Sequence, residues 1–367
     1  MTVALALVFG GYVVFVLAAA VQVWRQPTPP LLADDALPEA VVVIAARNEE
    51  ATIERCLRAV LAQDYPADKL TIVVADDHSS DGTATVVQSV AATEPSVRYL
   101  RVPDPEGPLR GKAQALHVAI AATEAPMILI TDADCAPVET WARALVSQLC
   151  EPDRHTGIAC GLARVAVRPD RWFDHVQALD WELLLGLMSA VAESGAPAGG
   201  MGNDMAVSRA AYESTGGYPA LPFSVTEDYA LIQAVAAAGW EVRFPIDARS
   251  VVWSHPVDGP RAMFEQRRRW ARGGVGDPWV VVVYALAFAV HALLVVGVVV
   301  APLAGLAALA ARTAADGVGL AAIRHRVGGR VGLLPLAATT LFMVGYLVTL
   351  PFVLALRPKI GWKGRRH

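Results

Sequence analysis

Residues 126–137 read PMILITDADCAP, and this stretch decides the fold. Residues 127–131 form a short apolar run between a proline and an acidic cluster, which predicts a buried strand. Asp132 and Asp134 follow at the carboxyl end of that strand, where ligands bind in an open α/β sheet. Two carboxylates on such a turn suit a divalent cation that bridges to substrate phosphates. An isolated Asp-x-Asp triplet is more commonly a solvated turn, so the neighbouring motifs must decide between the two interpretations.

Two earlier segments also combine an apolar, β-branched run with a polar turn. Residues 41–45 lead into ARNEE at 46–50, and residues 71–75 lead into DDHSSDGT, while a third run covers residues 97–102. Amphipathic helical patterns separate these runs, beginning after residue 50. The alternation predicts an α/β fold with a doubly wound, mostly parallel sheet.

The polar turns contain candidate binding and capping residues. Asp76 and Asp77 end the second strand at the edge that also holds Asp132 and Asp134. There they either accept hydrogen bonds from a ribose or a base, or form an Asx-rich turn and nothing more. Asn48 is predicted to cap the helix that follows ARNEE.

Charged residues also begin two other predicted helices. Lys112 lies in a first turn, where the helix dipole disfavours a cation, so it is either exposed or compensated by an anion such as a phosphate. Glu227 and Asp228 open a later helix that Thr226 could cap. Taken alone, this acidic pair would be an ordinary helix terminus.

The composition is uneven along the chain. The hydrophobic content of 54% and the mean hydropathy of +0.41 exceed the usual soluble range, and the excess lies at the two ends. The pattern predicts an N-terminal transmembrane anchor at 1–24, a linker at 25–38 and a soluble domain at 39–275. A C-terminal membrane region follows at 276–356, and a basic tail at 357–367 ends the chain.

The positive-inside rule orients these segments. Arg25 and the basic run at 267–272 place the soluble domain on the cytoplasmic side of the plasma membrane. We expect a crossing at 280–301, an interfacial or re-entrant piece at 303–326 and a last crossing at 331–356 that returns the tail to the cytoplasm. Four crossings in total are the alternative.

Other features exclude some partners. The net charge of -4 and the lack of a basic, aromatic face in the soluble domain argue against a nucleic-acid binder. The four cysteines lack CxxC spacing, as expected for reduced thiols. His175, His255 and His291 lack metal-ligand spacing and are expected to be structural or solvated. The oligomeric state cannot be read from the sequence.

The order ARNEE, DDHSSDGT, GKAQAL and TDADC resembles the membrane-bound family 2 glycosyltransferases, which have the GT-A (Rossmann-like) nucleotide-sugar fold. Three later segments also fit: GGMGNDMA at 199–206, TED at 226–228 and QRRRW at 266–270. The flanking apolar segments are similar to those of lipid-glycosylating members such as ceramide glucosyltransferase-like enzymes. The resemblance covers roughly residues 38–275.

The resemblance implies roles for particular residues. Asp228 would be the general base, and Asp134, with Asp132, would bind Mg²⁺ or Mn²⁺. The residues implied for the nucleotide and donor sugar are Ala46, Arg47, Glu49, Asp76, Asp77, Lys112 and Asp132. The residues implied for the acceptor and diphosphate are Asn203, Asp204, Glu227, Gln266, Arg269 and Trp270.

The implied activity is a metal-dependent, inverting transfer of a sugar from a nucleotide-diphosphate sugar, with UDP favoured, to a membrane lipid. One alternative is a processive β-glycan synthase of the cellulose, chitin or hyaluronan kind, although the small number of C-terminal spans argues against a translocation channel. A catalytically silent membrane scaffold is the other alternative. The intact acidic residues Asp77, Asp132, Asp134 and Asp228 argue against it.

Some positions depart from the family pattern or have a simpler explanation. His78 stands where the family more often has glycine, and Asp204 stands where asparagine is common. Arg267, Arg268 and Arg272 are expected to be interfacial anchors beside the membrane.

Overall fold

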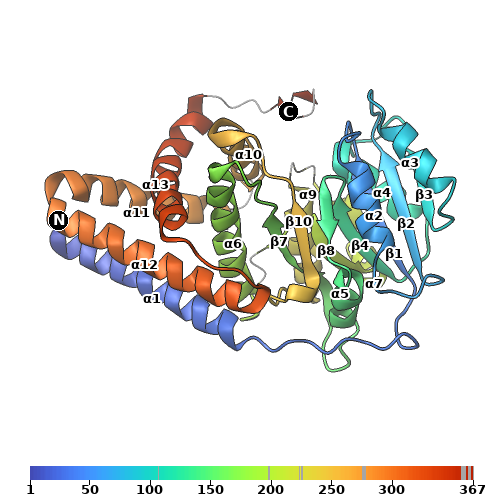
Figure 1. Ribbon diagram of the computed structural model, residues 1–367, viewed down its shortest axis with the longest axis horizontal. Coiled ribbons are helices and arrows are strands. Elements are labelled where there is room, and N and C mark those ends of the chain that lie inside the picture. Colours follow the sequence, from blue (N-terminus) through green and yellow to red (C-terminus); the bar gives the residue numbers. More distant parts are fainter. Residues whose placement is uncertain are drawn as a thin grey trace. The chain divides into compact units, whose positions relative to one another are not determined.

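The computed structural model describes residues 1–105, 107–196, 199–222, 224, 226–274, 278–356, 361–362 and 365–366 (Figure 1). The chain divides into two compact units. One comprises Gln26–Arg164 and Met188–His255, and the other comprises Met1–Arg25, Val165–Leu187 and Pro256–His367. We call them the sheet unit and the helical unit.

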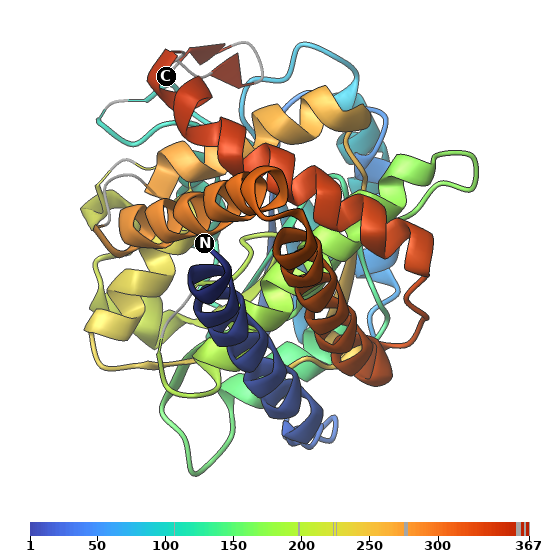
Figure 2. The ribbon, with the colours of Figure 1, turned by 90° about the vertical axis from the view of Figure 1, so that its left-hand side faces the viewer.

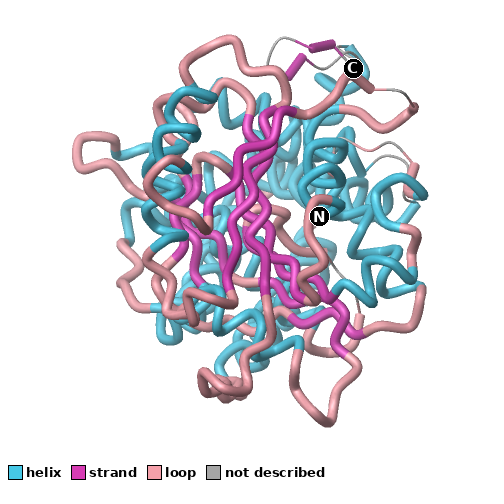
Figure 3. Tube along the Cα trace, turned by 90° about the vertical axis from the view of Figure 1, so that its right-hand side faces the viewer, coloured by secondary structure: helices cyan, strands magenta, loops and turns pink. Residues whose placement is uncertain are grey.

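The sheet unit is built on seven strands in the order β3-β2-β1-β4-β8-β6-β9. Figure 3 shows strands in magenta with helices in cyan around them. Strands β1 to β4 are mutually parallel, whereas β8 runs antiparallel to both β4 and β6. The mostly parallel sheet and its four predicted strands are therefore confirmed. The bounds are β1 (Ala40–Ala46), β2 (Leu70–Asp76), β3 (Val97–Arg101), β4 (Met127–Asp132), β6 (Thr156–Cys160), β8 (Asp204–Ser208) and β9 (Glu241–Arg243).

Both faces of this sheet are buried, which explains the continuous apolar runs of its strands. Alternate residues such as Val42 and Ile44 share a core with the apolar sides of α2, α3 and α5. Helix α4 packs against β1 and β2. The helix bounds are α2 (Ile53–Leu61), α3 (Thr83–Ala91), α4 (Gly111–Ala121), α5 (Trp141–Leu149), α7 (Arg209–Ser214), α8 (Gly217–Ala220) and α9 (Glu227–Ala237).

A smaller sheet of three strands, in the order β5-β10-β7, begins directly after the TDADC motif. Its strands are β5 (Cys135–Pro137), β7 (Leu162–Val165) and β10 (Val251–Ser254), and a 3₁₀ turn, η1 (Ala248–Ser250), leads into β10. Strands β5 and β10 are antiparallel.

The helical unit contains the long apolar helices (Figure 2). Among the described residues, four helices are long and apolar enough to cross a membrane: Thr2–Arg25, Val280–Val300, Pro302–Val327 and Leu333–Leu356. The elements are α1 (Thr2–Arg25), α10 (Gly259–Gly274), α11 (Pro278–Val300), α12 (Pro302–Val327), α13 (Leu333–Leu356), β11 (Gly361–Trp362) and β12 (Arg365–Arg366). Helix α6 (Trp172–Ala192) belongs to this unit up to Leu187. Most of the predicted tail at 357–367 lies outside the described residues.

Helices α1 and α12 lie side by side and run in the same direction, as Figures 1 and 2 show. The Tyr12 hydroxyl donates to Asp316 at 2.5 Å near the middle of the pair. The rings of Trp24 and His325 stack at 3.9 Å near the carboxyl ends. Residues later in α1 therefore contact residues later in α12, as expected for two parallel helices that pack together along their length.

Candidate functional site

The register of the large sheet brings the predicted site residues to one edge. Ala46 of β1 pairs with Asp76 of β2, and Ala45 pairs with Asp132 of β4. The antiparallel strand β8 begins at the same edge, because Asp204 pairs with Thr131. The ends of three parallel strands and the start of β8 therefore form a single edge rich in carboxylates.

Arg47 and Asp77 form the first part of this edge. The Arg47 Nη1 atom donates to the Asp77 carbonyl at 2.9 Å and lies 3.5 Å from its Oδ2. Asp76 precedes Asp77, and its carboxylate accepts from the Ser79 backbone N–H and the Tyr99 hydroxyl, both at 2.9 Å. Asp76 and Asp77 are both buried at this edge, and Arg47 is partly exposed beside them.

Two other residues assigned to the nucleotide pocket form hydrogen bonds with neighbouring segments of the chain. Ala46 is 1% exposed, and its carbonyl accepts from the Asp77 backbone N–H at 2.8 Å. The Glu49 carboxylate accepts from the Thr52 hydroxyl at 2.9 Å, while its backbone N–H donates to Thr83. These contacts hold the ARNEE segment against the DDHSSDGT turn.

The two turns at this edge contain residues in the left-handed backbone region. Asn48 has φ +53° and His78 has φ +60°, which explains why glycine suits position 78 in the family. The Asn48 carboxamide accepts from the Ser80 backbone N–H at 2.8 Å, and α2 begins later, at Ile53. The prediction that Asn48 caps a helix is wrong, because its side chain bridges the two turns.

Lys112 is the centre of a compact charged cluster. Its Nζ lies 2.7 Å from Asp132 Oδ1 and 3.0 Å from Glu227 Oε1, and its side chain is 18% exposed. Burial would lower the pKa of Lys112, but the carboxylates of Asp132, Glu227 and Asp228 outweigh it and hold that pKa well above its usual value. The exposed alternative for Lys112 is wrong, and its anionic partners in the chain are carboxylates.

The acidic pair forms the first turn of α9, as predicted. Its side chains contact residues that lie far away in the sequence. Burial, reinforced by Asp228 and opposed by Lys112, raises the pKa of Glu227. Asp228 Oδ2 accepts from the Gly202 backbone N–H at 2.8 Å, and its Oδ1 accepts from Tyr229. Among the described residues, Thr226 makes no side-chain capping bond.

Gly202 allows this contact because it has no side chain. A Cβ at Gly202 would lie 2.6 Å from the Asp228 Cβ and 3.0 Å from its Oδ2. The glycine-rich segment therefore approaches Asp228 more closely than any other residue type would permit. This approach fixes the Asp228 carboxylate beside the start of β8.

The small sheet adds a residue that the sequence patterns missed. Ser254 of β10 pairs with Cys135 of β5, so the next residues along, His255 and Asp134, are neighbours at the end of this ladder. His255 is exposed and Asp134 is half-buried. No sequence spacing relates two residues so far apart in the chain, and strand pairing alone places them together.

These donors fit a divalent cation. Carboxylate oxygens suit Mg²⁺ and Mn²⁺, and an imidazole is a further ligand for Mn²⁺. The carboxylates of Asp132, Glu227 and Asp228 outnumber the single lysine between them, so the cluster favours added positive charge. Among the described residues, no group of three His, Cys, Asp or Glu side chains forms a metal cage by itself, so substrate and water would supply the remaining ligands.

The two residues at the start of β8 are enclosed. Asp204 is 0% exposed, and its Oδ1 accepts from the Trp141 indole N–H at 2.8 Å. Burial raises the pKa of Asp204 well above its usual value. Asp204 is therefore enclosed in this structure, and its contact with an acceptor stays a prediction. Asn203 is 5% exposed, and its buried Oδ1 has no partner in the part of the chain described.

The QRRRW motif lies on α10 in the helical unit, where Gln266, Arg269 and Trp270 are half-buried. Arg267 is buried, pairs with Asp180 and lies 4.2 Å over the Trp270 ring.

The expectation of interfacial anchors is wrong for two of the three arginines. Arg267 and Arg268 are 4% and 6% exposed, whereas Arg272 is exposed. A buried guanidinium needs a paired charge, and α6 supplies Asp180 to Arg267 from far away in the sequence.

Residues 38–273 match the family described as "Glycosyltransferase like family 2". A probable glycosyltransferase, YdaM, of Bacillus subtilis is 28% identical over 65% of this chain and 55% of its own length. A beta-monoglucosyldiacylglycerol synthase of Synechocystis is 26% identical over 68% of this chain and 51% of its own. The chain thus spans about half the length of these relatives.

The mannosyltransferase PcManGT of Pyrobaculum calidifontis, solved with GDP-Man and Mn²⁺, superimposes with a TM-score of 0.62. The likeness covers 97% of this chain and 98% of that one at 24% identity. It confirms the GT-A fold expected from the sequence.

Proposed function

The chain belongs to the family 2 glycosyltransferases, and we propose that it transfers a hexose from a nucleotide-diphosphate sugar to a membrane lipid with inversion. The Lys112 cluster beside the Gly202–Asp228 contact carries the proposal. It gathers a proton acceptor and a cation at the edge where an α/β sheet binds its ligand. The similarity to a diacylglycerol-glycosylating relative supports a lipid acceptor.

Asp228 is the proposed general base. Its Oδ2 is oriented by the Gly202 N–H, which leaves a carboxylate in a fixed position beside the glycine-rich segment. The acceptor hydroxyl oxygen attacks the anomeric carbon as its proton passes to Asp228. The bond from that carbon to the diphosphate oxygen breaks, and its electron pair leaves with the nucleotide. One displacement of this kind inverts the anomeric configuration.

Lys112 and the TDADC turn are proposed to face the leaving group. Asp132 and Glu227 hold the Lys112 ammonium in place, so it can pair with a phosphate without first being ordered. When bound, Mg²⁺ or Mn²⁺ supplies charge neutralisation of the diphosphate, and Asp134, Asp132 and His255 would hold it. Arg47 and Asp77 would hold the ribose or base.

Asn203 of the sheet unit is a proposed acceptor residue, and Gln266, Arg269 and Trp270 of the helical unit are proposed to contact the acceptor or the diphosphate. We propose that α1 and α12 cross the bilayer together, because they are parallel partners over their length. This replaces the interfacial piece expected at 303–326. Arg25 and the basic run at 267–272 favour the cytoplasmic side of the plasma membrane for the catalytic domain.

The test uses purified protein in detergent with total membrane lipid, Mn²⁺ or Mg²⁺, and radiolabelled UDP-glucose, UDP-galactose, UDP-N-acetylglucosamine or GDP-mannose. Asp228→Asn keeps an oxygen for the Gly202 N–H but cannot take a proton, so turnover should fall about 10²–10⁴-fold. Asp153→Asn, which changes an exposed carboxylate, is the matched control and should retain full activity.

The product distinguishes the alternatives. A single labelled lipid that is lost in Asp228→Asn supports the proposal and identifies the donor. A ladder of polymer would support the processive synthase instead. Absence of both transfer and donor hydrolysis with every sugar would favour the scaffold.

A further inference from the structure

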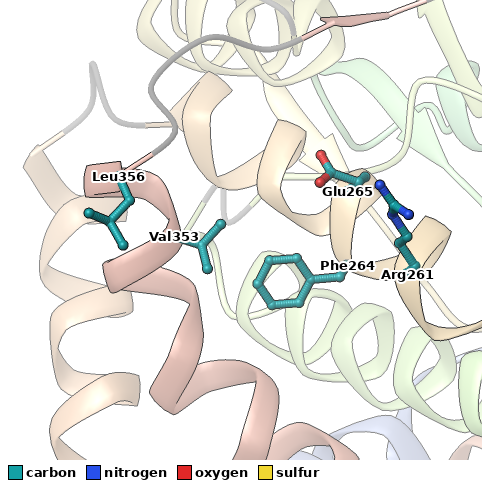
Figure 4. A pocket seen from close by; sticks show the side chains of 5 residues that line it. All are labelled: Arg261, Phe264, Glu265, Val353 and Leu356. Carbon is teal, nitrogen blue, oxygen red and sulfur yellow. The ribbon is translucent and has the colours of Figure 1, made fainter.

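A pocket of about 380 Å³ in the helical unit has no role in the proposed reaction. Arg261, Phe264 and Glu265 of α10 line one side, and Val353 and Leu356 of α13 line the other (Figure 4). Its volume falls in the range of small-molecule sites, which is roughly 300–1,000 Å³. The pocket therefore has room for part of a lipid-sized ligand.

One wall of the pocket is apolar. Figure 4 shows the Phe264 ring directed toward Val353 and Leu356. The centroids of the Phe264 and Tyr346 rings lie 5.6 Å apart in an edge-to-face arrangement, so Tyr346 helps to hold the ring in place. Leu356 is 81% exposed at the last residue of a helix apolar enough to cross a membrane. This wall suits an acyl chain.

The opposite rim has a net positive charge. The Glu265 carboxylate lies 2.6 Å from the Arg268 guanidinium, so its charge is compensated. Arg261 is exposed and has no ion-pair partner among the described residues. An uncompensated guanidinium is a strong ligand for a phosphate group.

The pocket and two of the proposed acceptor or diphosphate residues use different faces of α10. Arg261, Phe264 and Glu265 follow the i, i+3, i+4 spacing of one helix face. Gln266 and Trp270 follow it on another, rotated by about 140° or more at 3.6 residues per turn, and Arg269, four residues after Glu265, lies between the two faces. A ligand in the pocket is therefore not placed against Gln266 and Trp270.

We propose that this pocket binds an anionic phospholipid of the surrounding membrane, separate from the acceptor. Its phosphate pairs with Arg261, and its acyl chain lies along Phe264, Val353 and Leu356. An arginine-rich, amphipathic helix packed on an apolar helix is the arrangement expected at a lipid headgroup level. The bound lipid would hold α10, which also carries the QRRRW motif. The inference rests on the membrane placement but not on any donor or acceptor.

The test measures lipid binding rather than glycosyl transfer, so its outcome is separate from that of the proposed reaction. Full-length protein in detergent is titrated with phosphatidylglycerol or phosphatidylcholine. Lipids retained per protein are counted by native mass spectrometry, and thermal stabilisation is followed in parallel. The wild type should retain phosphatidylglycerol in preference to phosphatidylcholine.

Three variants locate the site. Arg261→Gln should weaken phosphatidylglycerol binding about tenfold or more, because a charge-assisted contact is lost. Val353→Trp should fill the pocket and displace both lipids. Arg272→Gln removes an exposed arginine from the same helix outside the pocket and should bind like the wild type.

Two results would overturn the proposal. One is equal loss in Arg261→Gln and Arg272→Gln, which would mean general attraction of a basic helix to anionic lipid. The other is unchanged phosphatidylglycerol retention in both Arg261→Gln and Val353→Trp.

Discussion

Replacing Lys112 with methionine should destabilise the sheet unit, because Glu227, whose side chain is 12% exposed, would lose its ammonium partner. The two carboxylates now lie 2.7 and 3.0 Å from Nζ. Breaking a buried pair costs about 3–5 kcal/mol. The Asp132 side chain is 34% exposed and regains water, so we expect the lower end, about 3 kcal/mol. For a domain of this size, that free energy lowers the unfolding temperature by about 6–12 °C.

The loss should depend on pH in a defined direction. Burial raises the pKa of Glu227, and Lys112 opposes that rise, so the pKa in Lys112→Met should be higher still. A carboxyl group whose pKa is raised by folding stabilises the native state below its unfolded pKa of about 4.3. That stability is lost as the pH rises through the folded value. The deficit of the variant should therefore be larger at pH 8 than at pH 5.

The assay is thermal unfolding in detergent at both pH values, followed by tryptophan fluorescence. The double variant Lys112→Met with Glu227→Gln removes both charges, so it should recover most of the lost stability at pH 8. An unchanged unfolding temperature in Lys112→Met at pH 8 would refute the reasoning. So would a deficit of equal size at both pH values.

Three further predictions concern the rest of the edge. Gly202→Ala places a Cβ 2.6 Å from that of Asp228, so kcat should fall by about 10²-fold or more; wild-type kcat in this variant would show that the contact is not needed. Burial raises the pKa of Asp204. The protonated Asp204 carboxyl therefore stabilises the fold below about pH 4, and this contribution is lost as the pH rises. Asp204→Asn keeps an acceptor for the Trp141 indole and should unfold with a weaker dependence on pH between 5 and 8; an identical slope would argue against a titrating Asp204. His255→Gln should raise the Mn²⁺ concentration needed for half-maximal activity about tenfold or more, and an unchanged requirement would remove His255 from the metal ligands.

The sequence by itself determined the strands of the central sheet and the edge where they end. The apolar runs at 41–45 and 127–131 predict buried strands, because they are short and are bounded by polar turn residues. The carboxyl ends of parallel strands meet at one edge, so the acidic residues that follow them had to lie together. These conclusions depend on local patterns, and local patterns are present in the sequence.

Tertiary structure alone decided the partners of the charged side chains. Lys112 meets Glu227 only because α4 and α9 bring them to the same edge, and the pairing of β10 with β5 places His255 and Asp134 at the same end of one ladder. Asp204 and Arg267 are polar residues with nothing in their own sequence surroundings to predict burial. Asp204 can be buried because the Trp141 indole N–H donates to it, and Arg267 can be buried because the Asp180 carboxylate pairs with it. The fold brings both partners from distant segments of the chain. The energy of a polar group depends on its neighbours in space, and the linear pattern does not contain those neighbours.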